Sequence, residues 1–197
     1  MPDHYYTQTP TSAHKPGQVD FLWRGAKLVF ETDSGVFSRT EIDKGTEILL
    51  NALPEELTGS LLDMGCGYGV IGVTLGKRYP GLSVVMSDVN ERAVELSRRN
   101  AQRNGVPARV MQSDGYADVP FQRMDWIVQN PPIRAGKSVI YAMFAEGARR
   151  LEPSGELWLV IRKQQGAESA VRYLKTLFGR VEAVSKKGGF WVLRCTQ

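Results

Sequence analysis

A glycine-rich segment near position 65 has the composition of a ligand-binding loop. Residues 61–62 read as a buried strand, three alternating glycines follow, and an apolar, helix-length pattern resumes at Val70. Glycines let the backbone approach a ligand closely and adopt positive φ at little cost. Asp63 would repel a pyrophosphate but suits an ammonium group, and Val70 stands where the dinucleotide fingerprint needs a third glycine. The segment therefore favours a nucleoside-bearing ligand with an amino group; a tight turn without a ligand is the alternative.

A second short run, Asn130-Pro131-Pro132-Ile133, follows the stretch 125–129, which reads as a strand. The two prolines lock φ and remove two backbone donors, so the turn is stiff and rich in acceptors. The Asn130 side-chain oxygen and the Pro131 carbonyl can both accept from one planar amino group. Holding such a group in line for transfer can lower a barrier by about 7–11 kcal/mol in the best cases. An ordinary strand-terminating turn is the alternative.

Acidic residues follow two further predicted strands. The strand 83–88 ends in Asp88, whose carboxylate can accept two hydrogen bonds from ribose hydroxyls. A helix-initiating aspartate is the alternative, because acidic groups favour helix N-termini. The strand 109–112 precedes Ser113-Asp114-Gly115, a sequence that also forms turns for purely local reasons.

The elements that position these residues alternate along the chain. A hairpin is predicted from 18–23 and 26–31, and the spacing over 41–53 is helical. Further helices are predicted to about 79 and over 91–104, 137–151 and 167–178, with a strand at 156–161 and a closing hairpin at 181–185 and 190–195. Strands separated by helices indicate an α/β fold with a doubly wound parallel sheet.

The segment Asp63-Met64-Gly65-Cys66-Gly67-Tyr68-Gly69 resembles motif I of class I S-adenosylmethionine-dependent methyltransferases, and the proline run resembles motif IV of their amino-group methyltransferases. The resemblance implies a Rossmann-like, seven-stranded, mostly parallel sheet with a reversed terminal strand, and S-adenosylmethionine as cofactor. It places Asp63 at the amino-acid end of the cofactor, directly or through water, and Asp114 at the adenine amino group. The residues expected to hold the cofactor are Asp63, Gly65, Cys66, Gly67, Asp88, Val89, Ser113, Asp114, Gly115 and Asn130, with packing the favoured role of the Cys66 side chain.

The segments Gly35-Val36-Phe37-Ser38 and Ile42-Asp43-Lys44-Gly45-Thr46, with the tail of short strands, resemble the bacterial guanine-N2 methyltransferases of ribosomal RNA, in particular their single-domain, small-subunit members. This resemblance covers nearly the whole chain, from about Tyr5 to Cys195. The catalytic set implied is Asn130, Pro131, Pro132 and Ile133. Two positions depart from the family: Ile133 replaces the usual aromatic, and Arg134 replaces the histidine of the larger members. Stacking contributes roughly 1–3 kcal/mol per base. Phe37 is therefore a candidate stacking residue, and Arg134 a candidate substrate contact through its guanidinium plane or a phosphate.

Composition agrees with one globular α/β unit. The chain has 197 residues, 42% apolar and 23% charged. We expect an N-terminal arm and hairpin at 1–40, packed on a methyltransferase domain at 41–197. The arm itself, residues 1–17, is expected to be extended and loosely held, with Tyr5 and Tyr6 as candidates to pin it. The two cysteines form no CxxC pattern, and the two histidines form no cluster, so neither a disulfide framework nor a metal site is expected. No apolar run reaches the ~20 residues of a membrane span, and no signal peptide is recognised, so a cytoplasmic enzyme is expected.

The net charge of +4 is mild, but its distribution is informative. Basic residues fall on the predicted helix 91–104 and near turns and strand ends, and those near the proline run could follow an RNA phosphate track. The full set of basic residues on this helix and near turns and strand ends is Arg24, Lys27, Arg92, Arg98, Arg99, Arg103, Arg109, Arg134, Lys137, Arg162, Lys163, Lys186 and Lys187.

Three alternatives to methylation of ribosomal RNA remain open. The acceptor could be a glutamine side chain of a protein or a base in DNA, or the chain could be a non-catalytic module that binds the cofactor and docks on RNA. A nicotinamide oxidoreductase is disfavoured by Asp63 and Val70. The oligomeric state and the methylated nucleotide are not specified by the sequence.

Overall fold

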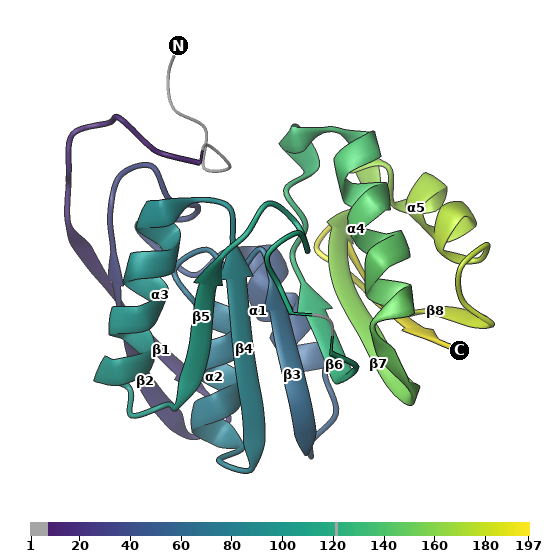
Figure 1. The fold of residues 1–197 in the computed structure, drawn as a ribbon, viewed down its shortest axis with the longest axis horizontal. Helices are drawn as coiled ribbons and strands as arrows, with labels where there is room; N and C mark the ends of the chain where they lie inside the picture. Colours follow the sequence, from purple (N-terminus) through teal and green to yellow (C-terminus); the bar gives the residue numbers. More distant parts are fainter. Residues whose placement is uncertain (1–7, 121) are drawn as a thin grey trace.

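A computed structural model describes residues 8–120 and 122–197 (Figure 1). Its main sheet has seven strands in the order β5-β4-β3-β6-β7-β9-β8. The strands are β3 (Gly59–Met64), β4 (Leu82–Asp88), β5 (Ala108–Gln112), β6 (Met124–Gln129), β7 (Leu151–Arg162), β8 (Arg180–Lys187) and β9 (Phe190–Thr196). Only β9, the last strand of the chain, runs antiparallel to its two neighbours, between β7 and β8. The predicted Rossmann-like sheet with a reversed terminal strand is confirmed.

Helices cover both faces of the sheet because the side chains of a strand alternate. Leu61 of β3 packs in the core with α1 (Lys44–Ala52), α2 (Val70–Arg78) and α3 (Glu91–Arg103). Its neighbour Leu62 packs in the opposite core with α4 (Lys137–Arg149) and α5 (Ala167–Leu174). Both leucines are fully buried. The result is a three-layer arrangement in which the sheet lies between two layers of helices.

The predicted hairpin is also present, as β1 (Gly17–Trp23) and β2 (Ala26–Thr32). Polar side chains of α3 cover its open edge: the Asn100 and Asn104 amides each exchange hydrogen bonds of 2.7–3.0 Å with the backbone of Glu31 and Val29. Trp23 and Phe30 pack into the core that contains Leu61. Tyr5 and Tyr6, which were expected to pin the arm, lie outside the described residues.

Several predicted boundaries were wrong. The helix predicted to reach 151 ends at Arg149, because Leu151 already pairs with Met124 and begins β7. The helix expected over 41–53 begins at Lys44, where the Asp43 side chain caps it by accepting from the Thr46 N–H at 2.9 Å. The last helix ends at Leu174 rather than 178. None of the described helices has the length and apolar character required to cross a membrane.

The order of the strands reverses between β3 and β6, which lie side by side and parallel. In open α/β sheets, ligands bind in the crevice outside the carboxyl ends of the strands at such a point. The glycine loop follows β3 and the Asn-Pro-Pro run follows β6. The fold therefore places the two segments singled out from the sequence next to each other.

Candidate functional site

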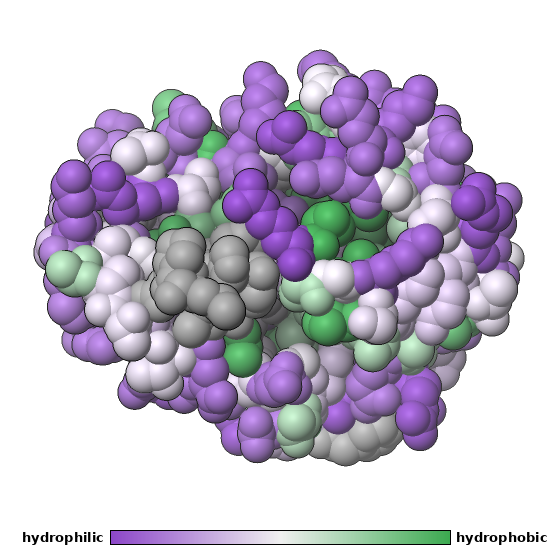
Figure 2. Space-filling view, turned by 90° about the horizontal axis from the view of Figure 1, so that it is seen from above, coloured by the Kyte–Doolittle hydropathy of each residue, from purple (hydrophilic) through white to green (hydrophobic). Residues whose placement is uncertain are grey.

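A cavity of about 360 Å³ opens at this crevice. Viewed from above, the molecule is hollowed, with hydrophobic residues on the floor of the hollow and hydrophilic residues around it (Figure 2). Most residues predicted to hold the cofactor line the cavity: Gly65, Cys66, Gly67, Asp88, Val89, Ser113, Asp114, Gly115 and Asn130. A single pocket thus brings together the ends of β3, β4, β5 and β6.

The glycine loop is bent tightly over the end of β4. Gly65, Gly67 and Gly69 all have positive φ, between 57° and 92°. The N–H groups of Gly65 and Cys66 both donate to the Ser87 carbonyl, at 2.8 and 3.0 Å. A β-carbon added at Gly65 or Gly67 would meet no atom within 4 Å. The glycines are required for their backbone conformation, and they leave open space beside the loop.

Asp88 lies at the end of β4 and faces this loop. Its carboxylate accepts from the N–H of Gly67 at 2.8 Å and from the N–H of Asn90 at 2.9 Å. The cap of α3 is Asn90, whose side chain accepts from the Ala93 N–H at 3.1 Å, so Asp88 is not needed to begin that helix. Burial raises the pKa of Asp88 to about 6, against the opposing effect of these hydrogen bonds. The carboxylate is therefore held at the cavity wall with capacity to accept further donors.

Asp63 does not line the cavity. It is fully buried beneath the glycine loop, and one carboxylate oxygen accepts from the N–H of Gly72 at 2.8 Å. The other oxygen has no hydrogen-bond partner among the described residues. Burial, with a smaller contribution from the charge of Asp88, raises the pKa of Asp63 to about 7. A buried acceptor without a partner is costly, so the site fits a ligand that brings a donor or a positive charge close to the loop.

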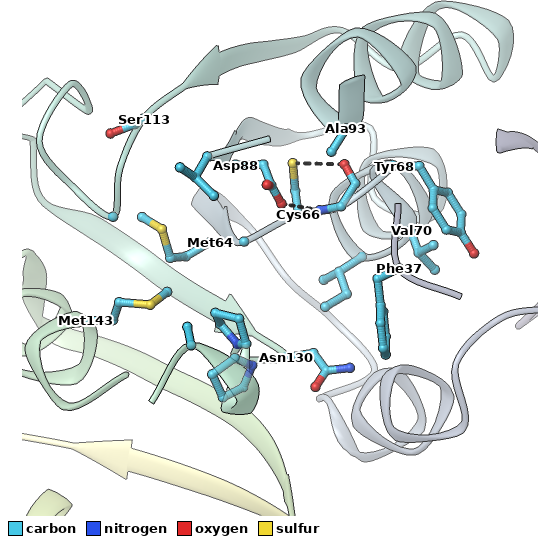
Figure 3. Close-up of a pocket in the computed structure, with 18 of the residues that line it drawn as sticks. Phe37, Met64, Cys66, Tyr68, Val70, Asp88, Ala93, Ser113, Asn130 and Met143 are labelled. Carbon is cyan, nitrogen blue, oxygen red and sulfur yellow. Dashed lines mark hydrogen bonds between the residues drawn. The ribbon is translucent and has the colours of Figure 1, made fainter. Parts of the chain in front are cut away.

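The far wall of the cavity comes from the turn after β5. The Ser113 N–H donates to the Asp88 carbonyl at 3.0 Å, and its hydroxyl accepts from the N–H of Asp118 at 2.9 Å. The neighbouring Asp114 is exposed. Figure 3 shows Asp88 and Ser113 toward one end of the cavity and Asn130 and Phe37 at the other.

Cys66 contributes to the wall without being reactive. Its thiol is buried and lies 3.4 Å from the Ser97 hydroxyl. Burial, together with the charges of Asp88 and Asp63, raises the pKa of Cys66 well above its ordinary value. Since the thiolate is the nucleophile of a cysteine, a neutral thiol in this position acts by packing.

Two residues at the start of α1 fix the orientation of the Asn130 side-chain amide. Its nitrogen donates two hydrogen bonds of 3.0 Å, to the carboxylate of Asp43 and to the hydroxyl of Thr46. Both amide hydrogens are thereby used, and the side-chain oxygen remains to accept. Pro131 and Pro132 line the cavity beside Asn130. The corner can therefore accept hydrogen bonds from a planar amino group but donates none from these side chains.

Sequence reasoning did not identify Asp43 and Thr46 as part of the site. Both residues line the cavity. The available signal was that aspartate is a favoured N-cap residue, although Asp43 lay inside the range 41–53 that was predicted to be helical. Their contacts with Asn130 join residues 87 and 84 positions apart, which no local pattern reports.

The next two residues of the proline run turn away from the cavity. Ile133 is not among the lining residues, and its half-buried side chain packs against the core that contains Leu62. Arg134 is exposed outside the lining. Phe37 does line the cavity and keeps 38% of its surface exposed. Its loop is held by Tyr68, whose hydroxyl donates to the Ser38 carbonyl at 3.1 Å.

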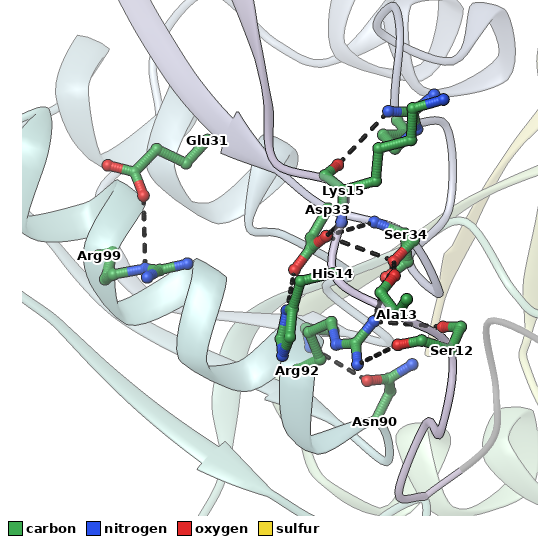
Figure 4. Close-up of polar contacts among 12 residues, drawn as sticks. Ser12, Ala13, His14, Lys15, Glu31, Asp33, Ser34, Asn90, Arg92 and Arg99 are labelled. Carbon is green, nitrogen blue, oxygen red and sulfur yellow. Dashed lines mark hydrogen bonds and ion pairs between the residues drawn. The ribbon is translucent and has the colours of Figure 1, made fainter.

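The N-terminal arm borders the same cavity. The sequence predicted a loosely held arm but not its position at the cavity. Gln8 lines the cavity, and its carbonyl accepts from the Glu91 N–H at 3.0 Å. The Arg92 guanidinium ties the arm down by donating to the carbonyls of Ser12 and Ser34, at 2.9 and 2.8 Å (Figure 4).

The Asp33 carboxylate holds the arm at a second point, through His14 and the Lys15 N–H. Burial raises the pKa of Asp33, but hydrogen bonds from His14 and from the Lys15 and Ser34 amides outweigh it and hold the pKa below its ordinary value.

The described part of the chain contains no group of three or more histidine, cysteine or acidic side chains arranged to bind a metal.

The sequence matches the model of the methyltransferase small domain family over residues 27–194. It is 44% identical over 197 residues, 98% of both chains, to the uncharacterized protein YbxB of Bacillus subtilis. It is 42% identical over 170 residues to the ribosomal RNA small subunit methyltransferase C of Hahella chejuensis, covering 80% of this chain and 49% of that one. The chain thus spans about half the length of the methyltransferase C relatives that it matches.

Among solved structures, the T. thermophilus 16S rRNA N2 methyltransferase RsmC, in complex with AdoMet and guanosine, superposes with a TM-score of 0.83. The sequences are 27% identical, and the match covers 95% of this chain and 52% of that one.

Proposed function

The chain belongs to the methyltransferase small domain family and is an S-adenosylmethionine-dependent methyltransferase; we propose that it methylates the exocyclic amino group of a guanine in ribosomal RNA. The observation that carries the choice of an amino group is the fixed amide of Asn130. Its two hydrogens are held by Asp43 and Thr46, so only its oxygen faces the acceptor. An exocyclic amino group offers two hydrogens, which match this oxygen and the carbonyl of Pro131.

We assign the cofactor to the end of the cavity formed by the glycine loop and the loops after β4 and β5. S-adenosylmethionine supplies a methyl group on a positively charged sulfur. The glycines at 65 and 67 give it room, and the Asp88 carboxylate accepts from the ribose hydroxyls. We assign Asp114, which lines the same end of the cavity, to the adenine amino group. The unpartnered oxygen of Asp63 favours the positive amino-acid end through a bridging water, because Asp63 itself does not reach the lining.

The residues at the other end of the cavity orient the acceptor. When Asn130 and Pro131 hold both hydrogens of the planar amine, its nitrogen lone pair is perpendicular to the plane of those hydrogen bonds and stays free to react. The nitrogen would gain one bond to the methyl carbon as the bond from that carbon to sulfur breaks, S-adenosylhomocysteine would be the leaving group, and the nitrogen would release one proton to water. No histidine is among the residues that line the described cavity. Positioning is therefore the main contribution of these side chains.

Phe37 is the proposed stacking partner of the base. Its ring is partly exposed within the lining and lies near Asn130, on a different loop (Figure 3). Ile133, which occupies the position of the family's usual aromatic, packs toward the protein core instead. An aromatic from the covering loop can supply the stacking that position 133 does not.

The relatives support the choice of a guanine in ribosomal RNA as the acceptor. Their names specify a small-subunit ribosomal RNA methyltransferase and an N2 methyltransferase bound to guanosine. Labelled methyl transfer to small ribosomal subunits, to a protein release factor and to DNA tests this choice. We expect label in the RNA of the subunit. Label in the release factor or DNA alone would contradict the acceptor, and absence of S-adenosylhomocysteine formation with any RNA would favour a non-catalytic module.

A further inference from the structure

We propose that seven cations beside the Asn130 corner form a binding surface for the phosphates of the RNA strand that carries the target base. This surface, here called the basic rim, consists of Lys44, Arg134, Lys137, Arg162, Lys163, Lys186 and Lys187. All seven are exposed. The inference rests on the proposed function, because it assumes that the acceptor base belongs to RNA.

The structure first removes five other basic residues from consideration. Arg24 lies in the hairpin turn and donates to the carbonyls of Leu53 and Pro54, both at 2.8 Å. Arg92 ties down the arm, and Arg98 donates to the Val110 carbonyl at 3.1 Å. The remaining arginines of α3, Arg99 and Arg103, form ion pairs with Glu31 at 3.4 and 3.0 Å. These cations already have structural partners.

The members of the basic rim have no such partners. Within residues 8–120 and 122–197, none of the seven forms an ion pair or a side-chain hydrogen bond. Three instead lie over aromatic rings: the Arg162 guanidinium is 4.6 Å from the Phe190 ring centre, the Lys186 ammonium is 4.2 Å from that of Trp191, and the Lys137 ammonium is 5.5 Å from that of Tyr141. Such contacts hold the side chains in place and leave their charges accessible to an anion.

The basic rim is continuous with the site. Arg162 and Lys187 are both in register with Phe190, so the ends of β7 and β8 meet at the carboxyl edge of the sheet. The turn of the β8–β9 hairpin reaches α1, since a β-carbon added at Gly188 would lie 3.9 Å from Cε of Lys44. Lys44 directly follows Asp43, which holds Asn130. The path from the amine-binding corner to the hairpin is therefore lined with positive charge.

The distribution of charge points to a polyanion. The seven cations exceed the net charge of the whole chain, +4, so the rest of the protein is net negative. Arg134, in the turn after β6, and Lys137, the first residue of α4, extend the surface beyond the ends of β7 and β8. A concentrated cationic surface on an otherwise acidic protein steers and orients a negatively charged strand. Phosphate contacts of this kind position the strand without reading its sequence.

Fluorescence anisotropy of labelled small-subunit ribosomal RNA, measured at several salt concentrations, tests the basic rim. The double substitution Lys186→Gln and Lys187→Gln should lower the slope of log affinity against log salt by about 1.4, at roughly 0.7 per lost phosphate contact. The pair Arg162→Gln and Lys163→Gln should act in the same way. The matched control, Lys27→Gln with Lys175→Gln, removes two exposed charges outside the rim and should leave the slope unchanged.

Cofactor affinity, measured by calorimetry, should equal that of the wild type in all three variants, because no rim residue lines the cavity. A slope that stays the same in both rim variants, or falls equally in the control, would overturn the assignment. This readout involves no methyl transfer. RNA bound through the rim without methylation of guanine would therefore uphold the surface and refute the proposed acceptor.

Discussion

The side-chain amide of Asn130 donates to the carboxylate of Asp43 at 3.0 Å, which ties the turn after β6 to the first residue before α1. The same carboxylate oxygen caps α1 through the Thr46 N–H. One carboxylate thus begins a helix and sets the direction of the proposed acceptor-binding oxygen. Asp43 acts through Asn130, as a positioning residue.

Replacement of Asp43 should separate these two roles. Asp43→Ser keeps a helix cap but is too short to hold Asn130, and we expect kcat to fall by roughly 10- to 100-fold, the scale of effect expected for small misplacement of a reacting group. Asp43→Asn keeps an acceptor at the same length and should recover most of the activity. Steady-state kinetics with cofactor calorimetry measure this. Equal activity of the serine and asparagine variants would exclude the positioning role.

Asp88 should make cofactor binding dependent on pH. Burial raises the pKa of Asp88 to about 6, so the carboxylate that we assign to the ribose hydroxyls becomes protonated as the pH falls below 6. We expect the dissociation constant to rise by up to about tenfold per pH unit below that point, following the fraction ionised. Asp88→Asn should bind more weakly at pH 8 and lack this component. Parallel pH profiles of wild type and Asp88→Asn, by calorimetry, would contradict the assignment.

Asp63 should influence the stability of the protein without cofactor. Its folded-state pKa of about 7 lies above the ordinary 3.8, so the folded protein binds the proton more tightly than the unfolded chain. The stability that the neutral carboxyl contributes is present at low pH and is lost as the pH rises through 7. Asp63→Asn stays neutral, and its Tm relative to wild type should increase by several degrees between pH 5 and 8, since 1 kcal/mol corresponds to roughly 2–4 °C. A difference in Tm independent of pH would argue against a buried titrating group.

Arg92 should affect the retention of the cofactor through the arm. Loss of its hydrogen bonds to Ser12 and Ser34 releases the segment that includes Gln8 at the cavity edge. For Arg92→Ala we expect several-fold faster cofactor dissociation in stopped-flow measurements. Arg98→Ala, on the same helix but with a side chain that donates to the Val110 carbonyl and to no residue of the arm that the structure describes, serves as the control. Identical dissociation rates in the two variants would remove the arm from this role.

Local patterns were sufficient for the residues that end strands. The glycine loop, Asp88 and Asn130 each lie at or just after the end of a predicted strand, and parallel strands bring their ends to one edge, so their grouping could be predicted. Asp43 and Gln8 reach the cavity from segments far away in the sequence, and only the packed structure reveals them.

The direction and the partners of a side chain were harder to predict than the position of its residue in the fold. Ile133 belongs to the proline run, but the short 3₁₀ turn Ile133–Ala135 carries its side chain to the core rather than to the cavity. The arginines of α3 resembled those of the basic rim in the sequence and differ only in having structural partners. Partners of this kind depend on tertiary contacts.

Mass spectrometry of nucleosides from small-subunit ribosomal RNA, treated with the protein and S-adenosylmethionine, tests the central claim most directly. The wild type should produce N2-methylguanosine, and Asn130→Ala should produce none while its cofactor affinity stays close to that of the wild type. A methylated nucleoside other than N2-methylguanosine would contradict the acceptor, and undiminished methylation by Asn130→Ala would contradict the amine-binding corner.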